Sequence, residues 1–153
     1  MTEIRYLEMI IFIGIPASGK STFYEQNFSE THTHISLDVL KTRNRENKML
    51  EETFALGKSC VIDNTNVSVE ERKKYIDAGK KHDYRVTGFY FRSAVDECRI
   101  RNNQRLGKKR VPSTALLNKA AHLELPSKEE GFDELYYVTL NNGDFEVNPY
   151  KEV

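Results

Sequence analysis

An apolar segment followed at once by a glycine-rich pattern constrains this sequence more than any other feature. Residues 9–15 read MIIFIGI, and Gly14, Gly19, Lys20 and Ser21 satisfy the pattern G-x-x-x-x-G-K-[ST]. An uninterrupted apolar run of this length is typical of a strand that helices cover on both faces. The glycines allow a tight turn that directs backbone N–H groups toward phosphate oxygens, and the N-terminus of a following helix adds positive potential. The pattern therefore predicts a nucleoside triphosphate site at the end of a buried strand.

Each part of this loop has an expected role toward ATP and Mg²⁺. We expect Lys20 to reach the β- and γ-phosphates, and Ser21 to offer its hydroxyl to the Mg²⁺ that bridges them. The other nucleotide-binding residues predicted here are Gly14, Pro16, Ala17, Ser18, Gly19 and Thr22.

Strand-like and helix-like segments alternate along the rest of the chain. Residues 33–36, 59–63, 84–91 and 135–140 are rich in β-branched, aromatic or other apolar residues and predict four more strands. Strands joined by helices favour parallel pairing with right-handed crossovers. The predicted fold is an α/β, P-loop NTPase-type three-layer sandwich with a five-stranded, mostly parallel sheet and a helical lid, formed by residues 1–153 as a single domain.

Helix boundaries carry their own signals. Ser68 and Glu71 stand three residues apart, as in a capping box, and predict a helix from Ser68 to about Lys81. Ser93 and Asp96 repeat this spacing before a helix expected to run to about residue 106. A further helix should follow residue 112, and the sequence NNGD at 141–144 predicts a hairpin turn.

Composition excludes several classes of protein. The chain of 153 residues is 39% hydrophobic and 30% charged, and no apolar run approaches the roughly 20 residues of a membrane helix. Cys60 and Cys98 form no metal-binding or redox spacing, so we expect a reducing, cytoplasmic location. The net charge of +0 removes any general attraction to nucleic acid. Basic character is local, in residues 99–110, whose charged residues are all basic.

The remaining motifs distinguish among phosphate-loop proteins. The Asn-Lys pair at Asn47 and Lys48 lacks the following aspartate of a GTPase base-reading loop. Asp63 is followed by Asn64 rather than by the glutamate that activates water in many ATPases. A kinase must keep water out, so the absence of that glutamate favours a kinase.

A kinase also needs a base for the acceptor hydroxyl and cations for the moving phosphoryl group. Asp38 follows the second predicted strand and is the candidate base, although it could instead be a helix N-cap. Arg101 and Arg105 lie one helical turn apart and could close over the triphosphate as a lid, or simply form a solvated basic face.

Four stretches follow one another along the chain: GIPASGKST, SLD, VIDNTNVSVEERKKY and RNNQRLGKKRVP. Together they resemble the kinase domain of polynucleotide 5′-hydroxyl kinases, over roughly residues 9–137. These include phage enzymes and the kinase half of animal polynucleotide kinase 3′-phosphatase. The resemblance implies that Asp38 is the general base and that Arg105 contacts the transferred phosphoryl group. It further implies that Asp63, with Thr65 and Asn66, steadies the metal or the acceptor end.

Two positions depart from the phage pattern. An arginine that grips the acceptor's 3′-phosphate is replaced by Lys41, with Arg43 the nearest arginine, and Leu37 replaces another arginine. Lysine lacks the bidentate fork of arginine, so the grip on such a phosphate would differ.

Three hypotheses follow for the partner of ATP. The first is the 5′-hydroxyl end of DNA or RNA, with Lys41, Arg43 and Arg45 as acceptor-side cations. The second is a small-molecule hydroxyl on a nucleoside, sugar or antibiotic, and the third is nucleotide binding without catalysis. The spacing of His32 and His34 resembles a metal site, but without a third ligand it indicates a solvated strand edge.

Overall fold

A six-stranded sheet organises the part of the chain that the structure, a computed structural model, describes, namely residues 6–152. The predicted domain limits, 1–153, extend beyond these residues at both ends. The strands are β1 (Glu8–Ile13), β2 (Thr33–Ile35), β3 (Cys60–Ile62), β4 (Arg85–Phe91), β5 (Glu134–Asn141) and β6 (Asp144–Pro149). The helices are α1 (Lys20–Asn27), α2 (Leu37–Leu40), α3 (Arg43–Leu56), α4 (Val69–Lys81), α5 (Val95–Asn103) and α6 (Ser113–His122), with 3-10 turns η1 (Gly107–Lys109) and η2 (Lys128–Glu130).

The strand order is β2-β3-β1-β4-β5-β6, and every pairing except β5 with β6 is parallel. The predicted α/β sandwich with a mostly parallel sheet is therefore confirmed. β1 lies in the middle of the sheet, and its residues 9–13 are all buried, as their continuous apolar run predicts. Ligands of such sheets bind beyond the carboxyl ends of the strands, where the phosphate-binding loop follows β1.

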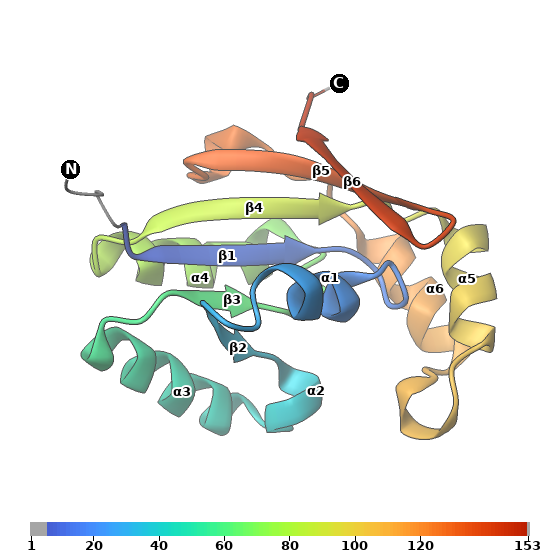
Figure 1. Cartoon of the computed structure of the whole chain (residues 1–153), viewed down its shortest axis with the longest axis horizontal. Helices are drawn as coiled ribbons and strands as arrows, with labels where there is room; N and C mark the ends of the chain where they lie inside the picture. The colour runs from blue at the N-terminus through green and yellow to red at the C-terminus, as the bar shows by residue number, and fades with distance from the viewer. Residues whose placement is uncertain (1–5, 153) are drawn as a thin grey trace.

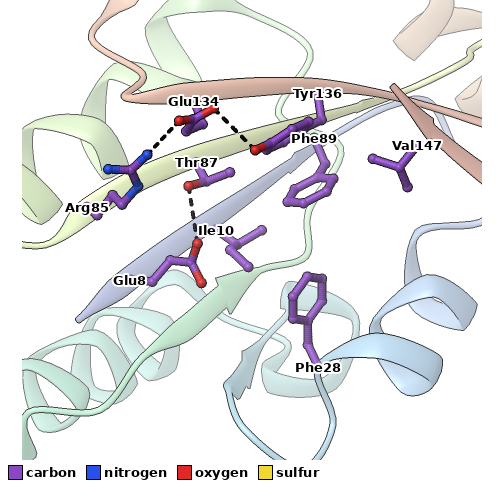
Figure 2. A pocket seen from close by; sticks show the side chains of 9 residues that line it. All are labelled: Glu8, Ile10, Phe28, Arg85, Thr87, Phe89, Glu134, Tyr136 and Val147. Carbon is purple, nitrogen blue, oxygen red and sulfur yellow. Dashed lines mark hydrogen bonds and ion pairs between the residues drawn. The ribbon is translucent and has the colours of Figure 1, made fainter. Parts of the chain in front are cut away.

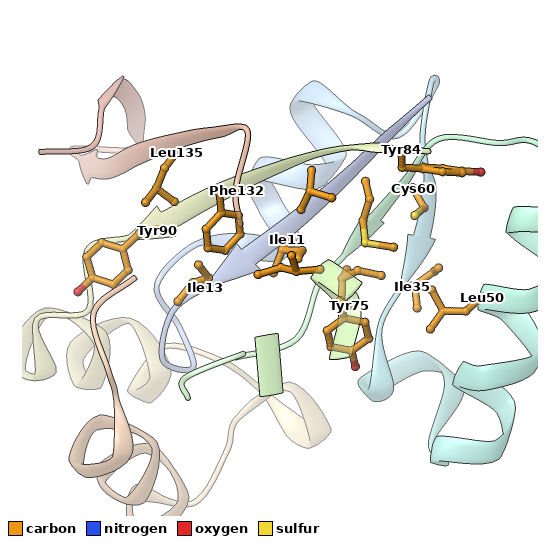
Figure 3. Close-up of a cluster of buried hydrophobic side chains, with 14 residues drawn as sticks. Ile11, Ile13, Ile35, Leu50, Cys60, Tyr75, Tyr84, Tyr90, Phe132 and Leu135 are labelled. Carbon is orange, nitrogen blue, oxygen red and sulfur yellow. The ribbon is translucent and has the colours of Figure 1, made fainter. Parts of the chain in front are cut away.

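Helices cover both faces of the sheet (Figure 1). On one face, α3 and α4 pack over side chains that alternate along β1, including Met9, Ile11 and Ile13 (Figure 3). On the other face, Phe23 of α1 packs against Phe12 with ring centroids 6.0 Å apart. The two faces of β1 thus hold two separate apolar cores, and the three-layer arrangement is confirmed.

The sheet has one strand more than the five predicted. The NNGD turn is confirmed, since Asn142 and Gly143 both have positive φ, at 51° and 83°, as a two-residue hairpin requires. The chain then returns as β6, an exposed edge strand that ends at Pro149. Edge strands tolerate proline and bury little, so β6 lacks the strong apolar pattern that marks the other strands.

Two of the predicted helix starts are correct and one is wrong. Ser68 is the N-cap of α4 and accepts a hydrogen bond from the Glu71 N–H at 3.1 Å, and α6 follows residue 112 as predicted. α5 begins at Val95, after an Ala94 cap, rather than at Ser93. The Ser93 hydroxyl instead donates to the carbonyl of Phe91 at 2.9 Å. In the described residues, no helix is long and apolar enough to cross a membrane.

Candidate active site

The phosphate-binding loop is fastened to the sheet from two sides. The Gly14 N–H donates to the carbonyl of Thr65 at 2.9 Å, and the Ile15 N–H donates to the Ser93 hydroxyl at 3.1 Å. These contacts place the loop between the ends of β3 and β4. Ala17 and Gly19 have φ of 65° and 104°, so the loop turns back sharply before α1. The loop geometry is thus held in place by groups outside it.

The loop has the features of a phosphate cradle. Among the described residues, Ser18 Oγ is the one buried side-chain polar atom without a hydrogen-bond partner. A Cβ atom on Gly14 would lie 2.7 Å from that Oγ, so any side chain there would displace it. A buried hydroxyl without a partner costs free energy. A phosphate oxygen could recover this free energy by accepting a hydrogen bond from the hydroxyl. Ser18 therefore fits a bound phosphate group.

Lys20 is the buried cation of the site. Its Nζ donates to the carbonyl of Ile15 at 3.0 Å, inside the loop. Burial lowers the pKa of Lys20 to about 8, against the opposing charge of Asp63. The charges of Arg105 and Asp38 also act on this ammonium group. The charges of three other predicted site residues thus act on Lys20, although all four come from different segments of the chain.

Ser21 and Asp63 form the candidate magnesium-binding pair. The Ser21 hydroxyl donates to Asp63 Oδ2 at 2.9 Å, and Asp63 lies at the carboxyl end of β3 with only 4% of its surface exposed. A hydroxyl and a carboxylate are oxygen ligands of the kind that Mg²⁺ prefers. The donor set therefore fits the cation that a triphosphate would bring.

Asp38 is positioned by its helix and does not cap it. Ser36 occupies the N-cap position of α2, and Asp38 is the second residue of that helix, exposed to solvent. The alternative interpretation of Asp38 as a cap is therefore wrong. Within residues 6–152, no hydrogen bond or ion pair engages the Asp38 carboxylate, which leaves it able to accept a proton.

A buried polar cluster supports the helix that carries Asp38. The Leu37 N–H donates to Asn64 Oδ1 at 2.9 Å, and the Asn64 amide donates to Glu46 Oε2 at 3.0 Å. Glu46 is fully buried and also accepts from the Tyr75 hydroxyl at 2.7 Å. The chain of bonds from Tyr75 to Leu37 ties α4 and α3 to the first residue of α2.

The charge of Glu46 is compensated inside this cluster. Burial alone would raise the pKa of Glu46, but hydrogen bonds from Tyr75 and Asn64, with the Arg43 charge, hold it below its ordinary value. Arg43 Nη1 lies 3.1 Å from Glu46 Oε1 and 2.9 Å from the Tyr75 hydroxyl. Sequence reasoning missed Glu46, because in the strongly polar segment RNRENKMLEE it looks like any surface glutamate.

Of the two predicted lid arginines, Arg101 lies in α5 and Arg105 lies just beyond it, because this helix ends at Asn103 and not at about residue 106 as predicted. Arg101 Nη1 donates to the carbonyl of Ala17 in the phosphate-binding loop at 2.9 Å, whereas Arg105 Nη1 donates to the carbonyl of Lys109 at 3.3 Å. Buried Asn102 exchanges two hydrogen bonds with the backbone of Val111, at 2.8 and 3.0 Å. Asn102 thereby closes residues 103–110 into a loop that emerges beside the nucleotide site.

The other predicted acceptor-side residues have varied surroundings. Lys41 ends α2 with φ of 74° and is exposed, and no ion pair engages it within residues 6–152. Thr65 is partly buried, and its carbonyl holds Gly14. Asn66 is 2% exposed, and its amide donates to the carbonyl of Phe12 at 2.8 Å. Lys41 is therefore the freest of these groups to meet a second substrate.

His34 belongs to the site, and the expectation of a solvated histidine pair was wrong. His34 Nε2 lies 2.8 Å from Asp63 Oδ2, and its ring stacks on Tyr24 with centroids 4.1 Å apart. His32 points to a different partner, with Nε2 2.9 Å from Glu8 Oε2. The side chains of His34 and His32 are 24% and 12% exposed. No sequence signal distinguishes the two histidines, because Asp63 is distant in the chain.

A hollow of about 290 Å³ elsewhere on the sheet holds none of the predicted site residues (Figure 2). Its polar groups satisfy one another: Thr87 donates to Glu8 at 3.3 Å, and Arg85 donates to Glu134 at 2.7 Å. Because these groups are already paired, nothing there resembles the free base and cations found beside the phosphate-binding loop.

Comparison with known families agrees with this geometry. A family model described as an AAA domain matches residues 9–126, from β1 to beyond α6. The chain belongs to this AAA domain family. The matched residues include the phosphate-binding loop, so this AAA domain is a P-loop domain.

Two curated relatives share much of the sequence of this AAA domain. A bifunctional polynucleotide phosphatase/kinase of Schizosaccharomyces pombe is 32% identical over 132 residues, which cover 84% of this chain and 32% of the relative. A putative bifunctional polynucleotide phosphatase/kinase of Acanthamoeba polyphaga mimivirus is 33% identical over 148 residues, which cover 89% and 34%. The AAA domain thus spans about a third of the length of each relative.

Solved structures show the same fold. A gluconokinase from Sinorhizobium meliloti 1021 superimposes with a TM-score of 0.63 at 18% identity, over 89% of this chain and 84% of the gluconokinase. At this identity the similarity concerns the fold of the AAA domain alone.

Proposed function

We propose that this protein is an ATP-dependent kinase that transfers the γ-phosphoryl group to a 5′-hydroxyl of DNA or RNA. The observation that carries this proposal is the Ser21–Asp63 pair beside the buried Lys20, whose ammonium group also responds to the charges of Arg105 and Asp38. Among residues 6–152 the Asp38 carboxylate has no hydrogen-bond or ion-pair partner. A cation, a metal-binding carboxylate, a lid arginine and a free base are the groups that phosphoryl transfer needs.

Each residue has a defined task in this mechanism. The loop N–H groups, the Ser18 hydroxyl and Lys20 bind the phosphates of ATP, and Arg101 braces the loop through Ala17. When bound at Ser21 and Asp63, Mg²⁺ supplies charge that offsets the negative charge of the triphosphate. Asp38 takes the proton of the acceptor hydroxyl, and it is fixed in place by the bond from Leu37 to Asn64.

Arg105 completes the charge stabilisation from the lid side. The charge of Arg105 lowers the pKa of Lys20, and we infer that both cations would face the transferred phosphoryl group. Their mutual repulsion costs free energy in the free protein and is relieved when an anion lies between them. This arrangement favours the triphosphate and the charge that develops during transfer.

The relatives support a polynucleotide acceptor. Both are named as bifunctional polynucleotide phosphatase/kinases and cover most of this chain at 32% and 33% identity. On the acceptor side, exposed Lys41 is one residue beyond α2 and would contact a backbone phosphate. Partly buried Thr65, in the segment between β3 and α4, is the second acceptor-side residue that we propose.

The test is transfer of labelled γ-phosphate from ATP with Mg²⁺ to 5′-hydroxyl DNA and RNA oligonucleotides and to mononucleoside 3′-phosphates. We expect labelled 5′ ends with the native protein and labelling slowed by about 100-fold or more with Asp38→Asn, which keeps the shape of the side chain but cannot accept the proton. Labelling of an oligonucleotide should fall steeply with salt if cations such as Lys41 hold its phosphates. Labelling of the ends by Asp38→Asn at the native rate would refute the base assignment.

A small-molecule hydroxyl is the second candidate acceptor. Lys41 and Leu37 stand where the phage pattern has arginines, so fewer guanidinium groups are available for a nucleotide phosphate. If nucleotide binding is intact but oligonucleotides stay unlabelled, the same assay should be repeated with nucleosides and sugars. Asp38-dependent labelling of one of these would establish this alternative.

A further inference from the structure

His34 makes a contact that the mechanism above leaves unused. Its Nε2 lies 2.8 Å from Asp63 Oδ2, and the same oxygen accepts the Ser21 hydroxyl at 2.9 Å. An ionised carboxylate can only accept hydrogen bonds, so Nε2 of His34 must carry the proton. Two donors, one from β2 and one from α1, thus converge on a single oxygen of Asp63.

The imidazole of His34 is itself held in place. Its ring stacks on the ring of Tyr24 with an interplanar angle of 19°. Tyr24 is 5% exposed, and its hydroxyl donates to the carbonyl of His32 at 2.6 Å. Ser21 and Tyr24 lie three residues apart on α1, so both neighbours of this carboxylate–imidazole pair come from the same side of one helix.

We propose that His34 is a positioning residue for the magnesium site. By donating to Asp63, His34 holds the carboxylate where it accepts the Ser21 proton. A hydroxyl has one proton and two lone pairs, so donation to Asp63 leaves Ser21 with only lone pairs to offer a cation. This inference rests on the proposed use of ATP and Mg²⁺. Outer residues that orient metal ligands often affect metal affinity strongly when they are replaced.

The test compares His34→Phe, which keeps a ring to stack on Tyr24 but has no donor, with His34→Gln, which restores an N–H donor. Affinity for a non-hydrolysable ATP analogue is measured by calorimetry with Mg²⁺ and again with EDTA. We expect the factor by which Mg²⁺ raises the affinity for the analogue to be about tenfold smaller in His34→Phe than in the native protein. Metal-free affinity should stay unchanged, and His34→Gln should recover most of the loss.

His32→Phe is the matched control, since His32 lies on the same strand and contacts Glu8 rather than Asp63. It should leave the gain from Mg²⁺ unchanged. If Mg²⁺ raises the affinity of His34→Phe for the analogue as much as it raises that of the native protein, the proposal is overturned. An equal loss of affinity with and without Mg²⁺, accompanied by a lower melting temperature, would also overturn it, because His34 would then serve only the fold.

These measurements use no acceptor, so the two proposals can fail separately. If the native protein gains nothing from Mg²⁺, the proposed ATP and Mg²⁺ chemistry fails and the role of His34 fails with it. If the native protein and His34→Phe gain equally, only the role of His34 is refuted. If His34→Phe loses the gain while no oligonucleotide is labelled, the role of His34 stands and the acceptor assignment fails.

Discussion

The Lys20 side chain should take up a proton when a triphosphate binds. In the free protein, burial lowers its pKa to about 8, and its Nζ bonds only to the Ile15 carbonyl among the described residues. Negative phosphate oxygens next to the ammonium group will raise that pKa again. With a pKa of about 8, the unprotonated fraction of Lys20 is about 0.1 at pH 7, about 0.5 at pH 8 and about 0.9 at pH 9. Each triphosphate that binds should therefore be accompanied by the uptake of about this fraction of a proton at each pH.

Calorimetric titration of a non-hydrolysable ATP analogue with Mg²⁺, in two buffers of different ionisation enthalpy, measures this uptake at each pH. Lys20→Arg is the control, because a guanidinium group stays charged throughout the range. Proton exchange by the ligand itself is common to both proteins and cancels in the difference. The difference between native protein and Lys20→Arg should therefore rise from about 0.1 to about 0.9 protons between pH 7 and pH 9.

A difference that stays flat across this range would refute the assignment of a depressed pKa to Lys20.

The same pKa shift of Lys20 has a consequence for the stability of the fold. Between about pH 8 and pH 10.5 the unfolded chain keeps the Lys20 proton and the folded chain releases it. The free energy of unfolding should therefore increase through Lys20, and the folded protein become more stable, as pH rises through that window.

Three further predictions concern other residues of the site. Asp38→Asn should lower kcat by about 100-fold or more while the Kd for ATP stays constant, as steady-state kinetics and calorimetry would show. Glu46→Gln should lower the free energy of unfolding by about 2 kcal/mol at pH 7 in urea titrations, because it weakens several hydrogen bonds to a buried charge. Exposed Glu52→Gln on the same helix is its control, with a change of at most about 0.5 kcal/mol. Since the folded pKa of Glu46 lies below its ordinary value of 4.5, the Glu46→Gln effect should shrink as pH falls below that value. Arg105→Ala should lower kcat by about 100-fold, and an unchanged kcat would leave Arg105 as a surface residue.

The sequence predicts well whatever depends on local pattern. The buried β1, the loop that follows it and the Ser68 cap of α4 all follow from residues that are neighbours in the chain. The hairpin turn is also local, since Asn142 and Gly143 tolerate the positive φ that it needs. Periodicity and turn chemistry therefore account for most of the fold and for the nucleotide half of the site.

What the sequence does not predict are the contacts between distant polar residues. Glu46 and His34 look like surface residues in their own segments, yet each meets a partner more than ten residues away. Ser93 matches the capping signature, but its hydroxyl holds the phosphate-binding loop through Ile15 instead. A polar side chain becomes buried only where the fold supplies hydrogen bonds, and periodicity carries no record of those bonds.

The segment Asp63–Asn66 explains how a local motif can organise a site made from distant elements. Its four residues contact different parts of the structure: Asp63 accepts the Ser21 hydroxyl, Asn64 accepts the N–H that begins α2, the Thr65 carbonyl holds the phosphate-binding loop, and the Asn66 amide bonds to the end of β1. One short loop after β3 therefore sets the distance between the nucleotide cradle and the helix of the base. Replacing the Asn64 or Asn66 side chain would remove one of these contacts and so disturb that distance. In the proposed mechanism the phosphate-binding loop holds the nucleotide, whereas this segment sets the position of α2 and thereby of Asp38, the proposed base.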